Sequence, residues 1–576
     1  MRGAATLALA FLAFLRSVIA EDYLVSRQLH QGHVKRADSF NISIYHVNDI
    51  HAHLDEIKTS GTDCVNATQG CYGGYARIKG VVDAKRPSSN NSLFLNLGDE
   101  FQGTLYYSFY GGEKIADTIN QLGFDAMTLG NHEFDQGENF LGNFIKNVTV
   151  PILCANINSK EQTINSTVKP YKVFPQFKTA VIAVTTDTVP SISNPSEDTV
   201  FSDPIATAQY WADYVYEHEK VERVIAMTHI GYKIDIELAK KTRGIHMIVG
   251  GHSHTLLGDM AGAQGKYPTI ETNLDGDEVF IVTAWRYGVY LGYIDVEFSG
   301  QKVLSYTGGP ILLDNTTQQD TKLNKQIKDW RGPFEEFAAV VVGTTDVELD
   351  QSTCQMKECT LGNVMCDAML DARANQSHVD GCIINAGGIR ATIDAGNITR
   401  GEVLTAFPFG NSLTELKFTG EELWKVWEGL VAGVSQFNGQ KTTSFAQVSK
   451  GIRVTYNPEN EAGKRLINLE IGQGAELKTV DLKKEYTIVT LDFLAGGGDN
   501  IFPAVKEIVA LDTQAEILTA YVETHSPIKT GVEGRIVETD KTKPVVPGSS
   551  NGAQAVVRSA WMPAALCMGV LLSLAL

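Results

Sequence analysis

Five short polar clusters restrict the possible fold of this chain more than any other feature, because each directly follows a run of apolar residues. The apolar runs cover residues 42–47, 92–97, 126–129, 224–227 and 247–249. The clusters begin at Asn48, Gly98, Gly130, Thr228 and Gly250, and each supplies Asp, Asn or His. Each run predicts a buried strand, and open α/β sheets bind ligands beyond the carboxyl ends of their strands. We therefore predict an α/β fold with its site at the strand ends.

The side chains in these clusters are typical of a metal site. They offer oxygen and imidazole ligands and contain no Cys, a combination that suits one or two hard-to-borderline divalent cations. A single cluster of this kind is more often a turn. Five of them at five strand ends in one half of the chain favour a metal centre.

The order of the clusters resembles that of the calcineurin-like metallophosphoesterases and, within them, the ecto-5′-nucleotidase family, over about residues 40–537. The resemblance implies a four-layer α/β sandwich, and two metal ions bridged by one aspartate. Zinc is the first expectation, with manganese, cobalt or magnesium as alternatives. Carried over by motif, the ligands are Asp49 and His51 for the first metal, Asp99 as the bridge, Asn131, His229 and His252 for the second metal, and His254 as a further ligand of the first.

Two residues of the third cluster are predicted to act in catalysis. The resemblance implies that His132 is a catalytic histidine near the phosphate, where an imidazolium would stabilise developing charge. Asp135 would hydrogen-bond His132 and orient it. Asp49 and His51 are two residues apart, so on a strand they would point to the same side.

The chain is long enough for two domains with their own cores. Alternating apolar runs and helical patterns, the latter at residues 203–220 and 234–243, predict βαβ units. The predicted organisation is a signal peptide at 1–20, the metallophosphoesterase domain at 40–315, a helical connector at 316–339, a second α/β substrate-binding domain at 340–537, a stalk at 538–551 and a removed tail at 552–576.

The second domain carries residues that suit a nucleotide. By resemblance, Phe409 and Phe493 would sandwich the nucleobase, and stacking of this kind tolerates any base. Asp499 would bind the ribose hydroxyls, and Asn385 and Arg390 would contact substrate. Animal members of the family carry an arginine where this chain has Gln355, so the nearest cation, Lys357, is the expected phosphate contact.

Both ends of the chain predict a secretory route. Residues 4–15 are apolar after Arg2, as in a signal peptide, and Lys35-Arg36 is a candidate processing site. Eight Asn-x-Ser/Thr sites predict glycosylation, at Asn41, Asn66, Asn90, Asn147, Asn165, Asn315, Asn375 and Asn397.

The last residues match a GPI-attachment signal. Small polar residues around Asn551, the predicted attachment site, precede a charge-free apolar end at 560–576. A tail-anchored transmembrane helix is the alternative, although the segment is short for one. We expect a GPI-anchored protein on the outer face of the plasma membrane.

Cysteine content agrees with an oxidising compartment. The resemblance implies three short-range disulfides, Cys64–Cys71, Cys354–Cys359 and Cys366–Cys382. Cys154 is then predicted to be a buried free thiol, and Cys567 falls in the removed tail.

The net charge of −18 argues against a nucleic acid polymer as partner, while a small anionic nucleotide remains compatible with a metal site. The leading prediction is an extracellular enzyme that hydrolyses nucleoside 5′-monophosphates. An apyrase or nucleotide-sugar hydrolase is the alternative with the same chemistry, and a non-catalytic surface glycoprotein is the alternative of another class. Members of the family are often dimers, so a homodimer stays open.

Overall fold

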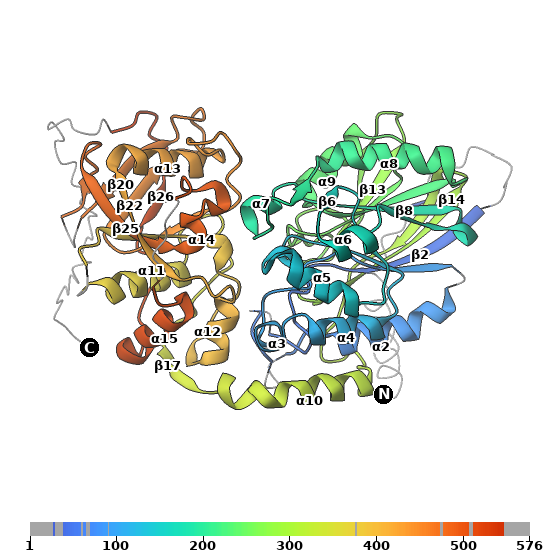
Figure 1. Cartoon of the computed structure of the whole chain (residues 1–576), viewed down its shortest axis with the longest axis horizontal. Coiled ribbons are helices and arrows are strands. Elements are labelled where there is room, and N and C mark those ends of the chain that lie inside the picture. The colour runs from blue at the N-terminus through green and yellow to red at the C-terminus, as the bar shows by residue number, and fades with distance from the viewer. Residues whose placement is uncertain are drawn as a thin grey trace, which may run out of the picture.

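The computed structural model describes residues 27–28, 39–58, 61–64, 70–89, 91–374, 377–472, 476–505 and 511–545. The predicted signal peptide, the Lys35-Arg36 site, Asn66, Asn90, Asn375, Asn551 and the apolar tail lie outside these ranges. Within them, no helix has the length and apolar character needed to span a bilayer. The chain forms two halves, linked by a helix that lies along the N-terminal half and leads into the C-terminal half (Figure 1).

Two sheets form the centre of the N-terminal half. The first has the order β1 (Arg27–Gln28), β15 (Lys302–Gly308), β14 (Tyr290–Ser299), β2 (Ser39–Val47), β3 (Ser92–Asn96), β4 (Ala126–Thr128) and β5 (Ile152–Leu153), with β16 (Ile311–Leu312) paired to β14. The second has the order β12 (Thr269–Thr272), β13 (Glu278–Val282), β11 (Met247–Gly250), β10 (Arg223–His229), β8 (Thr179–Thr185) and β7 (Tyr171–Phe174). A small β6 (Ile157–Ser159) and β9 (Thr199–Phe201) pair lies apart.

The two sheets pack face to face, and helices cover both outer faces. Buried residues of both sheets, such as Leu95 and Met227, share one apolar cluster. The first sheet's outer face packs against α2 (Tyr75–Lys85), α3 (Leu105–Tyr110), α4 (Glu113–Leu122), α5 (Gly137–Asn147) and α6 (Gln162–Thr167). The second is covered by α8 (Pro204–His218) and α9 (Tyr232–Lys241). This arrangement confirms the predicted four-layer α/β sandwich.

Parallel pairing brings the predicted site together. Strands β2, β3, β4 and β5 run parallel, as do β8, β10, β11 and β13. The central strands are buried along nearly their whole length, which explains their almost continuous apolar runs. Because parallel strands end at the same edge, the five polar clusters meet there.

The helical patterns are confirmed with small shifts of boundary. The pattern over 203–220 is α8, and Asp203 caps it by accepting the backbone N–H of Ala206. The connector contains α10 (Thr321–Ala338), whose buried apolar side includes Leu323, Ile327 and Phe334. A short α7 (Val189–Ile192) and the 3₁₀ turns η2 (Arg86–Ser88), η3 (His132–Phe134) and η4 (Pro175–Phe177) complete this half.

The C-terminal half is a second α/β unit with one apolar core. Its sheets have the orders β20 (Leu413–Thr419), β25 (Glu485–Leu491), β18 (Gly381–Asn385), β21 (Ala446–Val448), and β24 (Lys478–Thr479), β23 (Leu466–Ile471), β22 (Ile452–Tyr456), β26 (Ile536–Glu538), with β17 (Val341–Thr345) paired to β19 (Gly396–Thr399). Its helices are α11 (Thr360–Arg373), α12 (Arg400–Ala406), α13 (Gly420–Ala432), α14 (Asp492–Ala495), α15 (Gln514–His525), η5 (Ala386–Gly388) and η6 (Gly498–Asn500). Three helices begin with a capping box, at Thr399, Thr419 and Thr513.

The segment predicted to be an exposed stalk from residue 538 is partly attached to this unit. Glu538 closes β26, and the backbone N–H of Val545 donates to Ile467. The side chain of Asn457 also donates to the carbonyl of Lys541. Residues 541–545 are exposed, although hydrogen bonds from Thr539 and Val545 attach this segment to the sheet.

Two of the three expected disulfides are present, Cys64–Cys71 and Cys354–Cys359. The expected Cys366–Cys382 bond is not formed, and both residues are buried free thiols, as is Cys154. Cys382 lies on β18 under α11, where its thiol approaches the sulfur of Met369 at 3.7 Å. Burial and a hydrogen bond with Cys366 raise the pKa of the Cys382 thiol well above its usual value.

Candidate active site

The predicted metal-binding residues lie in tight turns beyond the strand ends. Asp49, His51, Asp99, His252 and His254 all have positive φ angles, between 49° and 79°. Such angles are costly for residues other than glycine and gather at functional sites. The strain is consistent with loops shaped to aim these side chains at one point.

This geometry corrects the expected arrangement of Asp49 and His51. Strand β2 ends at Val47, so neither residue lies on a strand. Instead the backbone N–H groups of Asp49 and His51 donate to the carbonyls of Gly98 and Asp99. A turn held to the neighbouring loop, rather than strand alternation, puts the two side chains on the same side.

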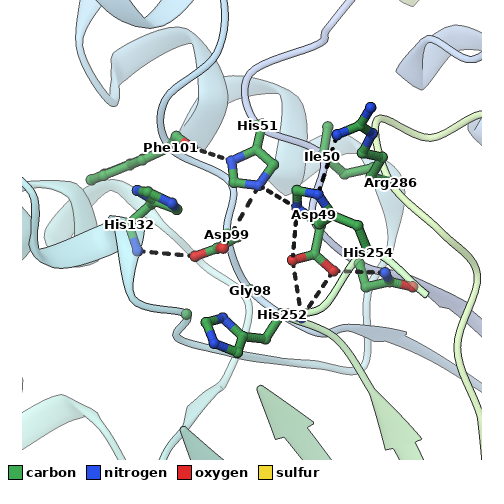
Figure 2. A network of polar contacts seen from close by, with 12 residues as sticks. Asp49, Ile50, His51, Gly98, Asp99, Phe101, His132, His252, His254 and Arg286 are labelled. Atoms are coloured by element: carbon green, nitrogen blue, oxygen red, sulfur yellow. Dashed lines mark hydrogen bonds and ion pairs between the residues drawn. The ribbon is translucent and has the colours of Figure 1, made fainter. Parts of the chain in front are cut away.

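Asp49, His51 and His254 form the first group of candidate ligands. Their ligand atoms all lie within 4.8 Å of one another. The Nε2 atoms of His51 and His254 are 3.0 Å apart, and His254 Nε2 lies 3.6 Å from Asp49 Oδ1 (Figure 2). The structure therefore brings His254, which comes from the last cluster, to the two residues of the first.

Asp99, His229 and His252 form a second group of candidate ligands, and their ligand atoms also lie within 4.8 Å of one another. The distance from His229 Nε2 to Asp99 Oδ2 is 3.1 Å, and Asp99 Oδ2 lies 3.7 Å from His51 Nε2. Asp99 thus stands between the two groups, as a bridging carboxylate would. Asn131 lines the same cavity as Asp99 and His252.

Backbone carbonyls set the orientation of two of these imidazoles. His51 Nδ1 lies 3.0 Å from the Phe101 carbonyl, and His229 Nδ1 lies 2.7 Å from the Leu97 carbonyl. A proton on Nδ1 satisfies each contact and leaves Nε2 free as a ligand atom.

The donor set fits a pair of divalent cations. Two buried atoms that face the site, Asn131 Oδ1 and His229 Nε2, have no hydrogen-bond partner among the described residues. Burial raises the pKa of the Asp49 carboxyl to about 7; His229 opposes this rise and Asp99 adds to it. Buried carboxylates are stable as anions only beside a compensating positive charge. A metal ion between these groups supplies that charge.

His132 and Asp135 form the predicted pair. His132 Nδ1 lies 2.7 Å from Asp135 Oδ2, and Ser193 Oγ donates to the other oxygen of Asp135 at 2.6 Å. Burial lowers the pKa of His132, but the carboxylates of Asp135 and Asp99 outweigh it and raise the pKa above its usual value. The ring is thereby oriented, and its charged form is favoured. Its ligand atom also lies within 4.8 Å of those of His51 and Asp99.

Glu133 is a site residue to which the sequence analysis gave no role. Its buried carboxylate accepts backbone N–H groups from Asp99, Glu100 and Gly130 at 2.5–3.0 Å. It therefore ties the loop of Asp99 to the loop of Asn131. The sequence contains one signal for a role of Glu133, because it directly follows Asn131 and His132, which are candidate site residues.

The substrate residues predicted in the C-terminal half reach the same cavity. Asn385, Arg390, Phe409, Phe493 and Asp499 line a volume of about 940 Å³ that is also lined by Asp99, Asn131, His132, His252 and His254. Asp499 is held by the side chains of Asn385 at 2.7 Å and Thr443 at 2.6 Å. The cavity is therefore built by both halves of the chain.

Arg390 is half-buried, whereas the three lysines of this cavity are exposed. Its Nη2 is 3.1 Å from His51 Nε2, and its guanidinium stands 5.6 Å from the ring centre of Phe409. The ring centre of Phe409 is 5.5 Å from that of His132. Phe409 thus lies against His132, and Phe409 and Phe493 both line the cavity.

Lys357 does not line the cavity, whereas Gln355 does. The backbone carbonyl of Lys357 accepts the side chain of Gln447, which fixes this loop against β21. The side-chain carbonyl of Gln355 accepts the backbone N–H of Phe445. This placement argues against the substrate contact predicted for Lys357. Three lysines to which the sequence gave no role, Lys233, Lys241 and Lys441, line the cavity instead.

A four-layer sandwich with Asp, Asn and His at the ends of parallel strands defines a calcineurin-like metallophosphoesterase. The family model described as calcineurin-like phosphoesterase matches residues 42–256. The model described as 5′-nucleotidase, C-terminal domain, matches residues 341–507.

Whole-chain comparisons agree with both models. The chain is 34% identical to a human 5′-nucleotidase over 530 residues, which cover 87% of this chain and 91% of that one. It is also 34% identical to a snake venom 5′-nucleotidase of Naja atra, of which it covers 99%. The crystal structure of a 5′-nucleotidase precursor from Thermus thermophilus matches with a TM-score of 0.79 and 31% identity, over 87% of this chain and 100% of that chain. The chain belongs to the 5′-nucleotidase family and is a hydrolase.

Proposed function

We propose that this chain is an extracellular enzyme that hydrolyses nucleoside 5′-monophosphates to nucleoside and phosphate with the help of two divalent metal ions. The observation that carries the proposal is the shared cavity. One wall presents the candidate metal ligands and His132, and the other presents Phe409, Phe493 and Asp499. A phosphate and a nucleoside joined in one molecule fit these two walls.

The candidate ligands suit zinc first, because they combine imidazole nitrogens with carboxylate and amide oxygens. Asp49, His51 and His254 would hold one ion, Asn131, His229 and His252 the other, and Asp99 would bridge them. When bound, such a pair neutralises phosphate charge and provides a nucleophile at neutral pH.

The remaining side chains of the cavity would bind and orient the substrate. Asp135 engages His132 Nδ1, which leaves Nε2 to stabilise charge on the phosphate or the leaving oxygen. Arg390 presents a planar fork that grips two phosphate oxygens. Asp499 accepts the ribose hydroxyls, and the two phenylalanines stack on the base.

A substrate panel tests the proposal. Phosphate release is measured from AMP, ADP, ATP and UDP-glucose with purified protein in added zinc, manganese or neither. AMP should be the best substrate, and chelation should abolish turnover. A protein that binds AMP but releases no phosphate from any of the four would be a binder and not an enzyme.

The role of His132 is tested separately. We expect His132→Ala to lower kcat by about 10²–10⁴-fold, as for a general acid or a charge-stabilising group, while the metal content is unchanged. Loss of one metal ion in this variant would make His132 a ligand instead.

Hydrolysis of ATP and ADP is the second candidate. Lys233 and Lys441 line the cavity, and neither ammonium has an ion-pair partner within 4 Å in the described part of the chain. Two available cations beside Arg390 would favour a substrate with additional phosphates. The ADP and ATP arms of the panel decide between the two.

The extracellular location is supported by two disulfides and by the exposure of Asn41, Asn147, Asn165, Asn315 and Asn397. A phospholipase that cleaves GPI anchors should release the protein from cells. Protein that needs detergent for extraction, once a lipase-resistant anchor has been excluded, would indicate a retained helix.

A further inference from the structure

Helix α9 carries one buried carboxyl group to which the proposed mechanism gives no role. Asp235 lies in the first turn of this helix and is only 1% exposed. Its side chain lies against the ends of β10 and β11, the strands that lead to His229 and His252. A buried carboxyl group costs free energy unless its neighbours compensate for it, so its contacts indicate what it does there.

Both oxygens of Asp235 contact the last residue pair of these two strands. Thr228 and Gly250 are paired where β10 and β11 run parallel. Thr228 Oγ1 donates to Asp235 Oδ1 at 2.6 Å. Asp235 Oδ2 occupies the space beside Gly250, where a Cβ atom would collide with it. The carboxyl group therefore contacts each strand one or two residues before its histidine.

This contact explains the glycine at position 250. The φ angle of Gly250 lies outside the left-handed region, so the backbone conformation does not require a glycine there. A side chain is excluded by the Asp235 carboxyl group and, at 3.3 Å from the Cβ position, by Thr228 Oγ1. Asp235 and Gly250 are therefore fitted to each other, and a change at Asp235 alters the support of the β11 end.

The first turn of α9 is also attached to the turn that carries His252. The backbone N–H of Tyr232 donates to Ser253 Oγ at 3.0 Å, and Ser253 directly follows His252. The two strand ends are joined to each other as well, because the backbone N–H of Gly251 donates to the carbonyl of Thr228 at 2.9 Å. Residues 232–235 therefore contact the chain next to both histidines.

The Asp235 carboxyl group is coupled to His229 by charge. Burial raises the pKa of this carboxyl to about 7, and the hydrogen bond from Thr228 and the charge of His229 oppose the rise. Asp235 Oδ2 has no hydrogen-bond partner among the described residues. Folding stability alone does not explain a group that loses its hydration for one hydrogen bond, whereas a role in orienting the neighbouring histidines does.

We propose that Asp235 is a positioning residue of the second metal site, where it holds the ends of β10 and β11 so that His229 and His252 converge on one ion. This inference rests on the ligand assignment of the proposed function. It adds a residue that touches neither metal nor substrate and whose effect is confined to one of the two ions. Groups that orient metal ligands from outside typically change metal affinity by about 10–100-fold.

Metal affinity is the readout, measured by titrating zinc into the metal-free protein in competition with a chelator of known affinity. Asp235→Ala should weaken the binding of one ion by about 10–100-fold and that of the other by less than about threefold. His229→Ala, which removes a ligand of the second site, shows which ion is affected. The ion that this variant retains should bind equally well after Asp235→Ala is added.

Three further variants separate positioning from a general loss of stability. Asp235→Asn keeps the shape of the side chain and the acceptor for Thr228, so it should bind both ions within about threefold of the wild type. Thr228→Val should weaken the same ion as Asp235→Ala and add no further loss to it, because both act through one contact. Asp213→Ala, at an exposed position of α8, is the control and should change neither affinity. Melting curves of the metal-free proteins confirm that each variant is folded.

Three results would overturn the inference: unchanged affinities in Asp235→Ala, an equal loss for both ions, or the same loss in Asp235→Asn as in Asp235→Ala. A wild type that binds fewer than two ions would remove the proposed two-metal centre and the inference with it. If two ions bind but AMP is not hydrolysed, the proposed function fails alone, because metal affinity is measured without substrate.

Discussion

Glu133 accepts backbone N–H groups from the loops that carry Asp99 and Asn131, and so acts as a structural carboxylate beside the ligating ones. The side chain is fully buried, and each oxygen is occupied by more than one of these N–H groups. The positions of two candidate metal ligands thus depend on a residue that would bind no metal.

We predict that Glu133→Gln lowers the free energy of unfolding by about 1–3 kcal/mol, because the new amide N–H would face backbone donors and leave them unsatisfied. Chemical denaturation of the metal-free proteins measures the effect. Glu113→Gln is the matched control on an exposed helix position and should change stability by less than about 0.5 kcal/mol. Equal stabilities of the two variants would contradict the assigned role.

The strand-end residues could be predicted from sequence because apolar runs mark the strands and the ligand types follow them at once. Three details could not. The fold of the turn at Asp49 depends on hydrogen bonds to a loop about 50 residues later. The exclusion of Lys357 from the cavity depends on Gln447, and the role of Glu133 depends on which backbone groups surround it. Long-range contacts of this kind have no local signal.

The pairing of β2 with β14 depends on a glycine. Gly292 lies opposite His46 in this pair, and a Cβ atom at Gly292 would stand 2.0 Å from His46 Nε2. The His46 ring occupies the space above the glycine and reaches the hydroxyl of Tyr267 at 3.0 Å. The pairing of β2 with β14 thus places the large side chain of His46 opposite the glycine at position 292.

We predict that Gly292→Ala destabilises the protein by about 1–3 kcal/mol through overpacking. Gly531 offers the opposite case, since a Cβ there meets nothing within 4 Å and its φ lies outside the left-handed region. Gly531→Ala should therefore stabilise the protein by about 0.4–1 kcal/mol, because it restricts the unfolded chain. Denaturation curves of both variants give the comparison, and a loss of stability in both would refute the explanation.

The same histidine predicts a pH dependence. Burial lowers the pKa of His46 to about 3, from 6.5 in the unfolded chain. The stability that the neutral ring provides is complete above pH 6.5 and is lost as the pH falls toward 3. Between pH 7 and pH 5 this loss is about 2 kcal/mol. The stability difference between wild type and His46→Gln should change by that amount in favour of the variant, and an unchanged difference would show that the ring is already charged.

Helices and strands were predictable where local signals agreed, as at Asp203 before α8. The disulfide predicted between Cys366 and Cys382 is not formed, although α11 and β18, which carry the two residues, lie against each other in the core. The two thiols are close enough for a hydrogen bond, and Cys382 also approaches the sulfur of Met369. The proximity of the two residues was therefore correctly expected, but the bond between them was not.

The two halves of the molecule are joined by polar contacts of Lys58 and Tyr287 with the C-terminal half. Lys58 reaches across to Asp394 at 2.7 Å and to Glu402 at 3.7 Å. The Tyr287 hydroxyl donates to the carbonyl of Arg390 at 2.9 Å. These contacts lie near Arg390, which is itself 3.1 Å from His51, so they stabilise this arrangement of the two halves.

We predict that Lys58→Met raises the KM for AMP about two- to fivefold, as expected for the loss of a partly exposed ion pair of about 0.5–1 kcal/mol that favours the binding-competent state. Lys160→Met, which breaks an exposed ion pair within the N-terminal half, is the control and should leave KM unchanged. Steady-state kinetics measures both. Small-angle scattering should show a larger radius of gyration for Lys58→Met without substrate.

The cavity has a further consequence for how proteins of this kind can diverge. The candidate metal ligands and His132 are encoded before residue 260, while the candidate base-stacking residues Phe409 and Phe493 are encoded after residue 380. Substitutions after residue 380 can therefore change the base preference without changing the candidate metal ligands. Hybrid chains that exchange residues 341–507 between relatives should inherit base preference from one parent and metal requirement from the other.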